Sequence, residues 1–204
     1  MPLDPHSLND AKKTLLAGGV VLLATDTVLG LVALPDNSDA VDKVYALKQR
    51  PRDKNLPIMV ASADQITTLG GQVTPSAQRC LRSAFMPGPL TIAVALDTNA
   101  TPEWLVDRTE CAIRIPDDAF LLSLLTDLGP LVVTSANLSG RDTPQTTTQA
   151  MTQLNGTPDY TVHGSAKSQS PSTLVNCRVL PAKIERIGAV SEAEINAILE
   201  HADD

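Results

Sequence analysis

Residues 48–54, KQRPRDK, place four cationic side chains within seven positions of a chain that is otherwise acidic. Arginine forks and lysine point charges both neutralise phosphate oxygens, so an anion of high charge density such as a triphosphate is one partner for this cluster. A solvated charged face is the other interpretation, and it is the commoner one for a run of charges. The dipole of one helix C-terminus does not require four cations, since a single charge there contributes about 0.3–1 kcal/mol. Asp53 is the one acidic residue among them.

Two further segments place hydroxyl, amide and carboxylate groups directly after apolar runs that are typical of strands. Thr25, Asp26 and Thr27 follow the first of these runs, and Ser135 and Asn137 follow the second. In open α/β sheets, ligands bind beyond the carboxyl ends of the strands. Both segments are also compatible with turns whose side chains bond only their own backbone, and for the second segment this is the commoner interpretation.

Arg114 interrupts an otherwise apolar strand, CAIRIP (111–116). An arginine in a central strand is rarely buried alone, so we expect a carboxylate from the protein or from a ligand beside it. The three cysteines and three histidines are scattered without a CxxC pair, which predicts reduced thiols and no metal ligated by the protein. The chain has no Walker-type phosphate loop, GxGxxG fingerprint or GxSxG elbow.

The composition limits the classes of protein that fit. A length of 204 residues with 43% hydrophobic residues predicts one globular domain, residues 1–204, with few aromatic side chains in its core. The net charge of −7 argues against tight, unaided binding to nucleic acid. The sequence shows no membrane-spanning run and no leader at its N-terminus, which predicts a cytoplasmic protein.

Strands and helices alternate along the chain, and this predicts an α/β domain with a largely parallel or mixed sheet. The predicted strands span 20–26, 30–36, 56–62, 90–96, 111–116, 130–136, 172–177 and 183–188. The predicted helices span 7–19 with Ser7 as cap, 38–50 with Ser38 or Asp39 as cap, 62–69, 75–84, 117–129 with Asp117 or Asp118 as cap, 146–154, and 191–202 with a capping box of Ser191 and Glu194.

These elements position the candidate groups. Pro51 ends the second helix near Arg50, so the basic cluster lies at a helix C-terminus and in the loop beyond it. Lys48 and Arg50 lie two positions apart, and in extended geometry they share one side. The polar stretch 137–171 is predicted to be a long surface loop or a flap near the site.

The chain resembles the YrdC-like family of threonylcarbamoyl-AMP synthases in seven short motifs that follow the family's order: TDTVLG (25–30), KQRP (48–51), PGP (87–89), IRIP (113–116), SAN (135–137), SPST (170–173) and RIG (186–188). Each motif alone is weak, but seven in the right order and spacing are hard to obtain by chance. The resemblance runs from about residue 8 to residue 200. It implies a YrdC-like fold, a twisted mixed sheet flanked by helices with a concave basic cleft.

The resemblance also implies an activity, that of an ATP-dependent nucleotidyltransferase. Such an L-threonylcarbamoyladenylate synthase forms threonylcarbamoyl-AMP and pyrophosphate from L-threonine, bicarbonate and ATP, and Mg²⁺ arrives with the ATP. The product would pass to partner proteins that modify adenosine 37 of tRNAs reading ANN codons, with weak or no direct binding of tRNA by this chain.

The resemblance carries over to individual residues. Lys48 and Arg50 match the catalytic pair, and both are expected at the surface of a cleft. The expected contacts of ATP are Lys48, Arg50, Lys54, Asn137 and Arg186. The expected contacts of threonine and bicarbonate are Thr27, Arg114, Ser135 and Ser172, with Arg114 taking the threonine carboxylate.

Two departures from the family's pattern leave other functions open. Leu29 stands where family members often carry Tyr, and Ala61 stands where many carry His. The alternatives are an enzyme acting on another amine, a YciO-like relative that binds nucleotide or RNA with a different substrate, and a non-catalytic RNA-binding module. The net charge and the scarcity of aromatic residues weigh against the last of these.

Overall fold

The computed structural model describes residues 4–200. The helices in this range are α1 (Pro5–Leu16), α2 (Ser38–Lys48), α3 (Asp64–Thr68), α4 (Pro75–Arg82), α5 (Ala119–Leu128), α6 (Thr147–Gln153) and α7 (Glu192–Glu200), with a 3-10 turn η1 (Glu103–Leu105). The strands are β1 (Val21–Ala24), β2 (Leu29–Ala33), β3 (Ile58–Met59), β4 (Gly71–Gln72), β5 (Leu90–Leu96), β6 (Glu110–Arg114), β7 (Leu131–Ser135), β8 (Tyr160–Thr161), β9 (Thr173–Asn176) and β10 (Lys183–Arg186).

The strands of residues 4–200 form one mixed sheet with the order β10-β9-β5-β6-β3-β7-β2-β1-β8, and β4 pairs with β5. The prediction of a mixed sheet is confirmed, and a largely parallel one is wrong. Within the described residues, parallel pairing is limited to β1–β8, β3–β6 and β5–β9. The short connection between β1 and β2 explains their antiparallel pairing, because a parallel pair needs a long crossover.

Each predicted helix and strand is present, mostly with shorter bounds, and the last two positions predicted for the final helix lie outside the described residues. The elements β4, β8 and η1 were not predicted, because two or three residues carry no readable periodicity. The stretch 137–171 is no plain loop, because it contains α6 and β8.

Two of the predicted helix caps are wrong. Asp4 caps α1 in place of Ser7, and its carboxylate accepts the Ser7 N–H at 3.1 Å. Asn37 caps α2 in place of Ser38 or Asp39. In both helices the acceptor is the residue just before the first helical position, from which a short side chain reaches the first-turn N–H groups. The other capping predictions are confirmed, with Asp118 at α5 and the box of Ser191 and Glu194 at α7.

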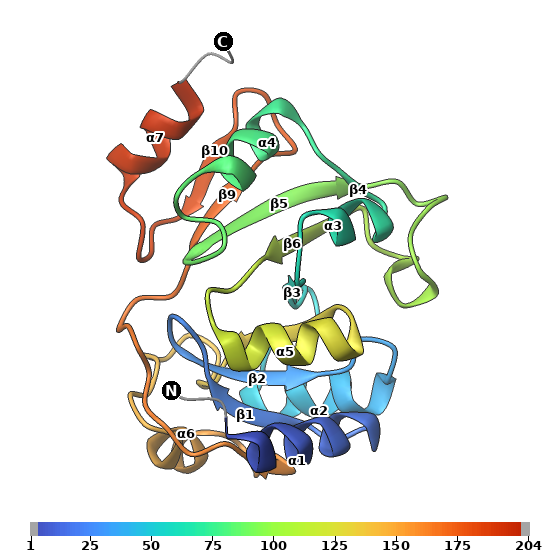
Figure 1. Cartoon of the computed structure of the whole chain (residues 1–204), viewed down its shortest axis with the longest axis vertical. Helices are drawn as coiled ribbons and strands as arrows, with labels where there is room; N and C mark the ends of the chain where they lie inside the picture. The colour runs from blue at the N-terminus through green and yellow to red at the C-terminus, as the bar shows by residue number, and fades with distance from the viewer. Residues whose placement is uncertain (1–3, 201–204) are drawn as a thin grey trace.

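Helices cover both faces of the sheet. Figure 1 shows α1 and α5 in front of β1 and β2 with α2 behind them, while α3, α4 and α7 lie in the upper part with β5, β9 and β10. Leu15 of α1 and Leu125 of α5 pack against Leu23 and Val133 in one apolar cluster. Ala40 and Val44 of α2 belong to the second cluster, as do the buried apolar residues of α3, α4 and α7.

The strand register determines which side chains can meet on the open part of the sheet. Since side chains alternate between faces along a strand, pairing places one series on the same face: Arg186, Leu174, Thr91, Arg114, Met59, Ser135 and Gly30. Over β1, β2 and β7 this face is covered by α1 and α5, whereas α3, α4 and α7 pack on the opposite face of the sheet. This face of the sheet is therefore left open beyond the part that α1 and α5 cover.

Candidate active site

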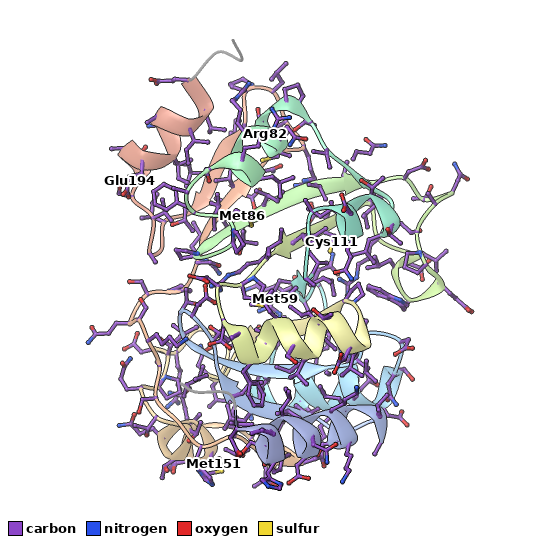
Figure 2. The ribbon with its side chains drawn as sticks, in the orientation of Figure 1. Met59, Arg82, Met86, Cys111, Met151 and Glu194 are labelled. Atoms are coloured by element: carbon purple, nitrogen blue, oxygen red, sulfur yellow. The ribbon has the colours of Figure 1, made fainter. Side chains whose placement is uncertain are left out.

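A cavity of about 830 Å³, including its open mouth, lies on this open part of the sheet. Met59, which lines it, is labelled in Figure 2 between α5 and the upper part of the molecule. Residues predicted from the sequence that line the cavity are Thr27, Arg50, Arg114, Ser135, Ser172 and Arg186. They come from the β1–β2 turn, the loop after α2, and strands β6, β7, β9 and β10 or the residues next to them, so only the folded sheet brings them together.

Two arginines that form no ion pair within residues 4–200, Arg50 and Arg186, bring positive charge to the cavity. Arg50 donates from Nε to the Lys54 carbonyl at 2.9 Å and from Nη2 to the Asn55 carbonyl at 2.8 Å. Arg186 donates to the Ser172 carbonyl at 2.7 Å. Carbonyl oxygens fix the two guanidinium groups without neutralising them, so their charge remains available to an anion in the cavity.

The direction of the pKa shift of Arg186 agrees with this crowding of positive charge. Burial lowers the pKa of Arg186, and the charges of Arg114 and Arg50 lower it further. Burial also lowers the pKa of Arg50, although Tyr45 and Asp53 oppose the change. Like charges that converge on one cavity favour an anionic ligand there.

Arg114 has the carboxylate partner that its strand position predicts. Its Nη2 lies 2.7 Å from Asp26 Oδ2, and the two side chains are only 5% and 8% exposed. Its Nη1 donates to Thr27 Oγ1 at 2.8 Å, and its Nε donates to the Gly88 carbonyl at 2.8 Å. These three contacts fix the Arg114 guanidinium, which in turn holds Thr27 in place at the cavity.

The sequence left two roles open for the hydroxyl groups of the β1–β2 turn, ligand binding and bonding of the turn's own backbone, and the structure is compatible with both. Thr25 Oγ1 donates to the Val28 carbonyl at 2.7 Å and accepts the Thr27 N–H at 3.0 Å, so the turn does bond its own backbone. Thr25 and Thr27 nevertheless both line the cavity. The Thr27 carbonyl accepts the Lys167 and Ser168 N–H groups at 3.0 and 2.8 Å, so the end of the 137–171 stretch is bound to this turn.

Lys48 was expected at the surface of the cleft, and the structure instead buries its side chain. Gln49 has a left-handed backbone, φ 47°, so Lys48 and Arg50 are not held in extended geometry on a shared side. Lys48 is 2% exposed, and it does not line the cavity. Its ammonium donates to the Ser135 carbonyl and, at 2.9 Å, to the Asn137 carbonyl. Burial lowers the pKa of Lys48 to about 7, and the charge of Arg50 adds to the lowering.

Lys54 and Asn137 also lie outside the cavity lining. The Lys54 side chain is exposed, and its carbonyl accepts from Arg50. Asn137 is buried, and its Nδ2 donates to the carbonyls of Leu138 at 2.9 Å and Arg141 at 2.6 Å. In this structure Asn137 therefore stabilises the turn after β7.

Thr91, Asn55 and Thr134 are polar residues of the cavity that the sequence reasoning missed. Thr91 lines the cavity, and its Oγ1 lies 2.7 Å from Ser172 Oγ. It interrupts the apolar strand LTIAVAL just as Arg114 interrupts its own strand, and the same signal could have found it. Asn55 follows the basic cluster and has no signal of its own, since loop asparagines are common.

We expect Gly188→Ala to damage the cavity wall that carries Ser172. A Cβ atom at position 188 would lie 2.1 Å from the Pro171 carbonyl oxygen and 2.6 Å from the Ser172 carbonyl carbon, so the backbone has to move. The expected loss of unfolding free energy in urea is about 1–3 kcal/mol. Gly164→Ala is the control, since its Cβ would meet Ala24 Cβ at an ordinary 3.8 Å. Equal stability of the two variants would contradict this packing.

Within residues 4–200, no cluster of three or more histidine, cysteine, aspartate or glutamate side chains is arranged to hold a metal ion. None of the helices described above combines the length and the apolar character that a membrane crossing requires.

Comparison with known proteins places the chain in a family. Residues 13–188 match the Sua5_yciO_yrdC family, whose description reads "Telomere recombination". The chain is 34% identical over 165 residues to a putative threonylcarbamoyl-AMP synthase of Methanocaldococcus jannaschii, and the match covers 80% of this chain and 77% of that protein. It is 32% identical over 204 residues to the threonylcarbamoyl-AMP synthase of Bacillus subtilis, covering 96% of this chain but only 59% of that relative.

Two solved structures share the fold. Sua5 of P. abyssi, complexed with L-threonine, has a TM-score of 0.87 and 25% identity, and the match covers 98% of this chain and 59% of the other. YciO of E. coli has a TM-score of 0.82 and 22% identity over 94% of both chains, and it supports the fold alone. The match to the family over residues 13–188, together with the M. jannaschii relative, shows that this chain belongs to the Sua5/YciO/YrdC family.

Proposed function

We propose that this protein is an L-threonylcarbamoyladenylate synthase that forms threonylcarbamoyl-AMP and pyrophosphate from L-threonine, bicarbonate and ATP. The observation that carries the proposal is the convergence of the family's motif residues on one cavity: Thr27, Arg50, Arg114, Ser135, Ser172 and Arg186. The names of the two relatives, and the threonine bound to the P. abyssi protein, support the choice of substrate.

The chemistry requires no protein nucleophile. The amine of threonine condenses with bicarbonate, and water leaves to give a carbamate. A carbamate oxygen then attacks the α-phosphorus of ATP, and the bond to the bridging oxygen breaks so that pyrophosphate leaves. The protein has to align the reactants, neutralise the phosphate charge and keep water away from the labile carbamate and anhydride.

The contacts of the cavity residues suggest their roles. Arg50 and Arg186 hold phosphate oxygens, because their own hydrogen bonds go to neutral carbonyls. Arg114 lines the cavity beside the hydroxyl of Thr27, and we assign its guanidinium to the threonine carboxylate. The hydroxyls of Ser135 and Ser172 lie on the cavity wall and can bond the carbamate.

The remaining reactants and partners follow from the same reaction. Mg²⁺ enters bound to the ATP phosphates, as part of the substrate. We assign the exposed Lys54 side chain, which lies outside the cavity lining, to the outer phosphates of ATP. The labile product passes in the cytoplasm to partner proteins that modify tRNA.

We expect release of pyrophosphate from ATP to require both L-threonine and bicarbonate. The measurement is an enzyme-coupled pyrophosphate assay with L-threonine, L-serine, glycine or no amine. Faster release with serine or glycine would keep the mechanism and change the substrate. No release with any amine, from folded protein that still binds ATP, would contradict the proposed reaction.

A further inference from the structure

Residues 163–171, the strap, join β8 to Ser172 on the cavity wall. Residues 163, 165, 167, 169 and 170 of the strap are exposed, and the other four are only half-buried. Burial therefore contributes little to its position, and polar contacts have to hold it. The Ala166 N–H donates to the Gln145 carbonyl at 2.8 Å, which fixes the first part of the strap.

The next two residues of the strap bind the backbone of Thr27. The N–H groups of Lys167 and Ser168 donate to the Thr27 carbonyl at 3.0 and 2.8 Å, although neither residue lines the cavity. The Thr27 hydroxyl lines the cavity and accepts from Arg114 Nη1 at 2.8 Å. The position of the strap therefore affects where Thr27 lies and where its hydroxyl points.

The Lys167 side chain fastens the strap to the start of α5. Its Nζ lies 2.7 Å from Asp118 Oδ2, and the Lys167 and Asp118 side chains are 43% and 9% exposed. Asp118 Oδ1 accepts the Leu121 N–H at 3.0 Å as the N-cap of α5, so the carboxylate is already oriented by a helix. A charged hydrogen bond to a fixed and nearly buried carboxylate contributes more than a pair of two mobile surface side chains.

These contacts form a closed ring. Arg114 donates to the Thr27 hydroxyl, the Thr27 carbonyl accepts the Lys167 N–H, and the Lys167 ammonium pairs with Asp118, which follows Arg114 by four positions in the chain. We propose that Lys167 is a positioning residue, whose ion pair with Asp118 holds Thr27 in register with Arg114. Its role in turnover rests on the proposed function, in which Thr27 and Arg114 bind threonine.

The far end of the strap is fixed without this ion pair. Ser172 Oγ lies 2.7 Å from Thr91 Oγ1, and the Ser172 carbonyl accepts from Arg186 Nη2 at 2.7 Å. The Thr173 N–H donates to the Pro89 carbonyl at 3.0 Å. Loss of the ion pair should therefore disturb the threonine side of the cavity and leave the phosphate side in place.

Lys167→Met removes the ammonium but keeps an unbranched stem and the backbone N–H. We expect the KM for L-threonine in pyrophosphate release to rise about tenfold, while the KM for ATP stays within about twofold of the wild type. Asp118→Asn should have the same effect, because asparagine still caps α5 but carries no charge. Lys167→Arg should restore the threonine KM, and the double variant of Lys167→Met with Asp118→Asn should be no worse than either single one.

Lys12→Met is the matched control, since it breaks the exposed ion pair with Asp127 on the same helix, and both KM values should stay at the wild-type level. A KM for ATP that rises as much as that for threonine in Lys167→Met would show direct contact with phosphate and overturn the proposal. Additive losses in the double variant would also overturn it, because the two side chains would then act separately.

Amide hydrogen exchange tests the ion pair without any assay of activity. At positions 167 and 168 we expect exchange about tenfold faster in Lys167→Met and Asp118→Asn, and unchanged exchange in Lys12→Met. Wild-type exchange at these two positions in both of the first two variants would overturn the proposal. If Lys167→Met fails to fold, Asp118→Asn provides the same comparison. If the wild type releases no pyrophosphate with any amine, the proposed function fails, and the exchange rates alone decide whether the ion pair holds the strap on Thr27.

Discussion

Arg50→Ala is expected to lower kcat/KM for pyrophosphate release by about 100-fold or more, because it removes a fixed positive charge from the phosphate side of the cavity. Arg50 is held by the Lys54 and Asn55 carbonyls, so its guanidinium is already oriented before ATP binds. A 100-fold loss corresponds to about 2.7 kcal/mol of transition-state stabilisation. The measurement is the initial rate of pyrophosphate release at varied ATP, with folding checked by circular dichroism.

Arg52→Ala is the matched control, since Arg52 is a neighbour in the same basic cluster. Its side chain is 60% exposed, pairs with Asp42 at 2.5 Å and lies over the Tyr45 ring at 4.4 Å. Exposed pairs of this kind contribute little, and Arg52 does not line the cavity. We expect its kcat/KM to stay near that of the wild type. If both variants lost activity equally, the effect would come from the overall charge of the loop, and the assignment of Arg50 to phosphate would be wrong.

The basic cluster also shows how far sequence reasoning extends. Charge density and Pro51 were enough to predict a helix C-terminus with cations around it, and the structure confirms this. The separate directions of Lys48 and Arg50 depend on one left-handed residue, Gln49. Glutamine carries no signal for that backbone conformation, which is most favourable for glycine, so a local pattern could not reveal it.

Tertiary pairing explains the other differences. The strand position of Arg114 predicted a carboxylate, but Asp26 is supplied by the β1–β2 turn, and its proximity depends on the sheet order. The strands β4 and β8 have two residues each and exist because neighbouring strands pair with them. The alternation of apolar runs predicted the longer elements correctly, since burial on both faces leaves a plain pattern in the sequence.

Asp26→Ala is expected to cost about 3–5 kcal/mol of unfolding free energy, because it leaves the Arg114 guanidinium buried without its counter-charge. Among the described residues, neither Asp26 oxygen accepts a well-aligned hydrogen bond, so the ion pair is what compensates for burying the carboxylate. Burial lowers the pKa of Arg114 despite the opposing effect of Asp26, which indicates how strongly the site disfavours an isolated charge. Urea unfolding of the purified variants measures the loss.

Two controls separate this burial effect from the loss of any surface charge. Asp127→Ala breaks the exposed pair with Lys12, whose side chains are 37% and 44% exposed, and it should cost about 1 kcal/mol or less. The double variant Asp26→Ala with Arg114→Met removes both charges, and it should be more stable than Asp26→Ala alone, since no unpaired ion remains. If Asp26→Ala and Asp127→Ala unfold alike, water reaches the Arg114 site in solution. In that case Asp26 does not hold Arg114, and the placement of Thr27 depends on the β1–β2 turn alone.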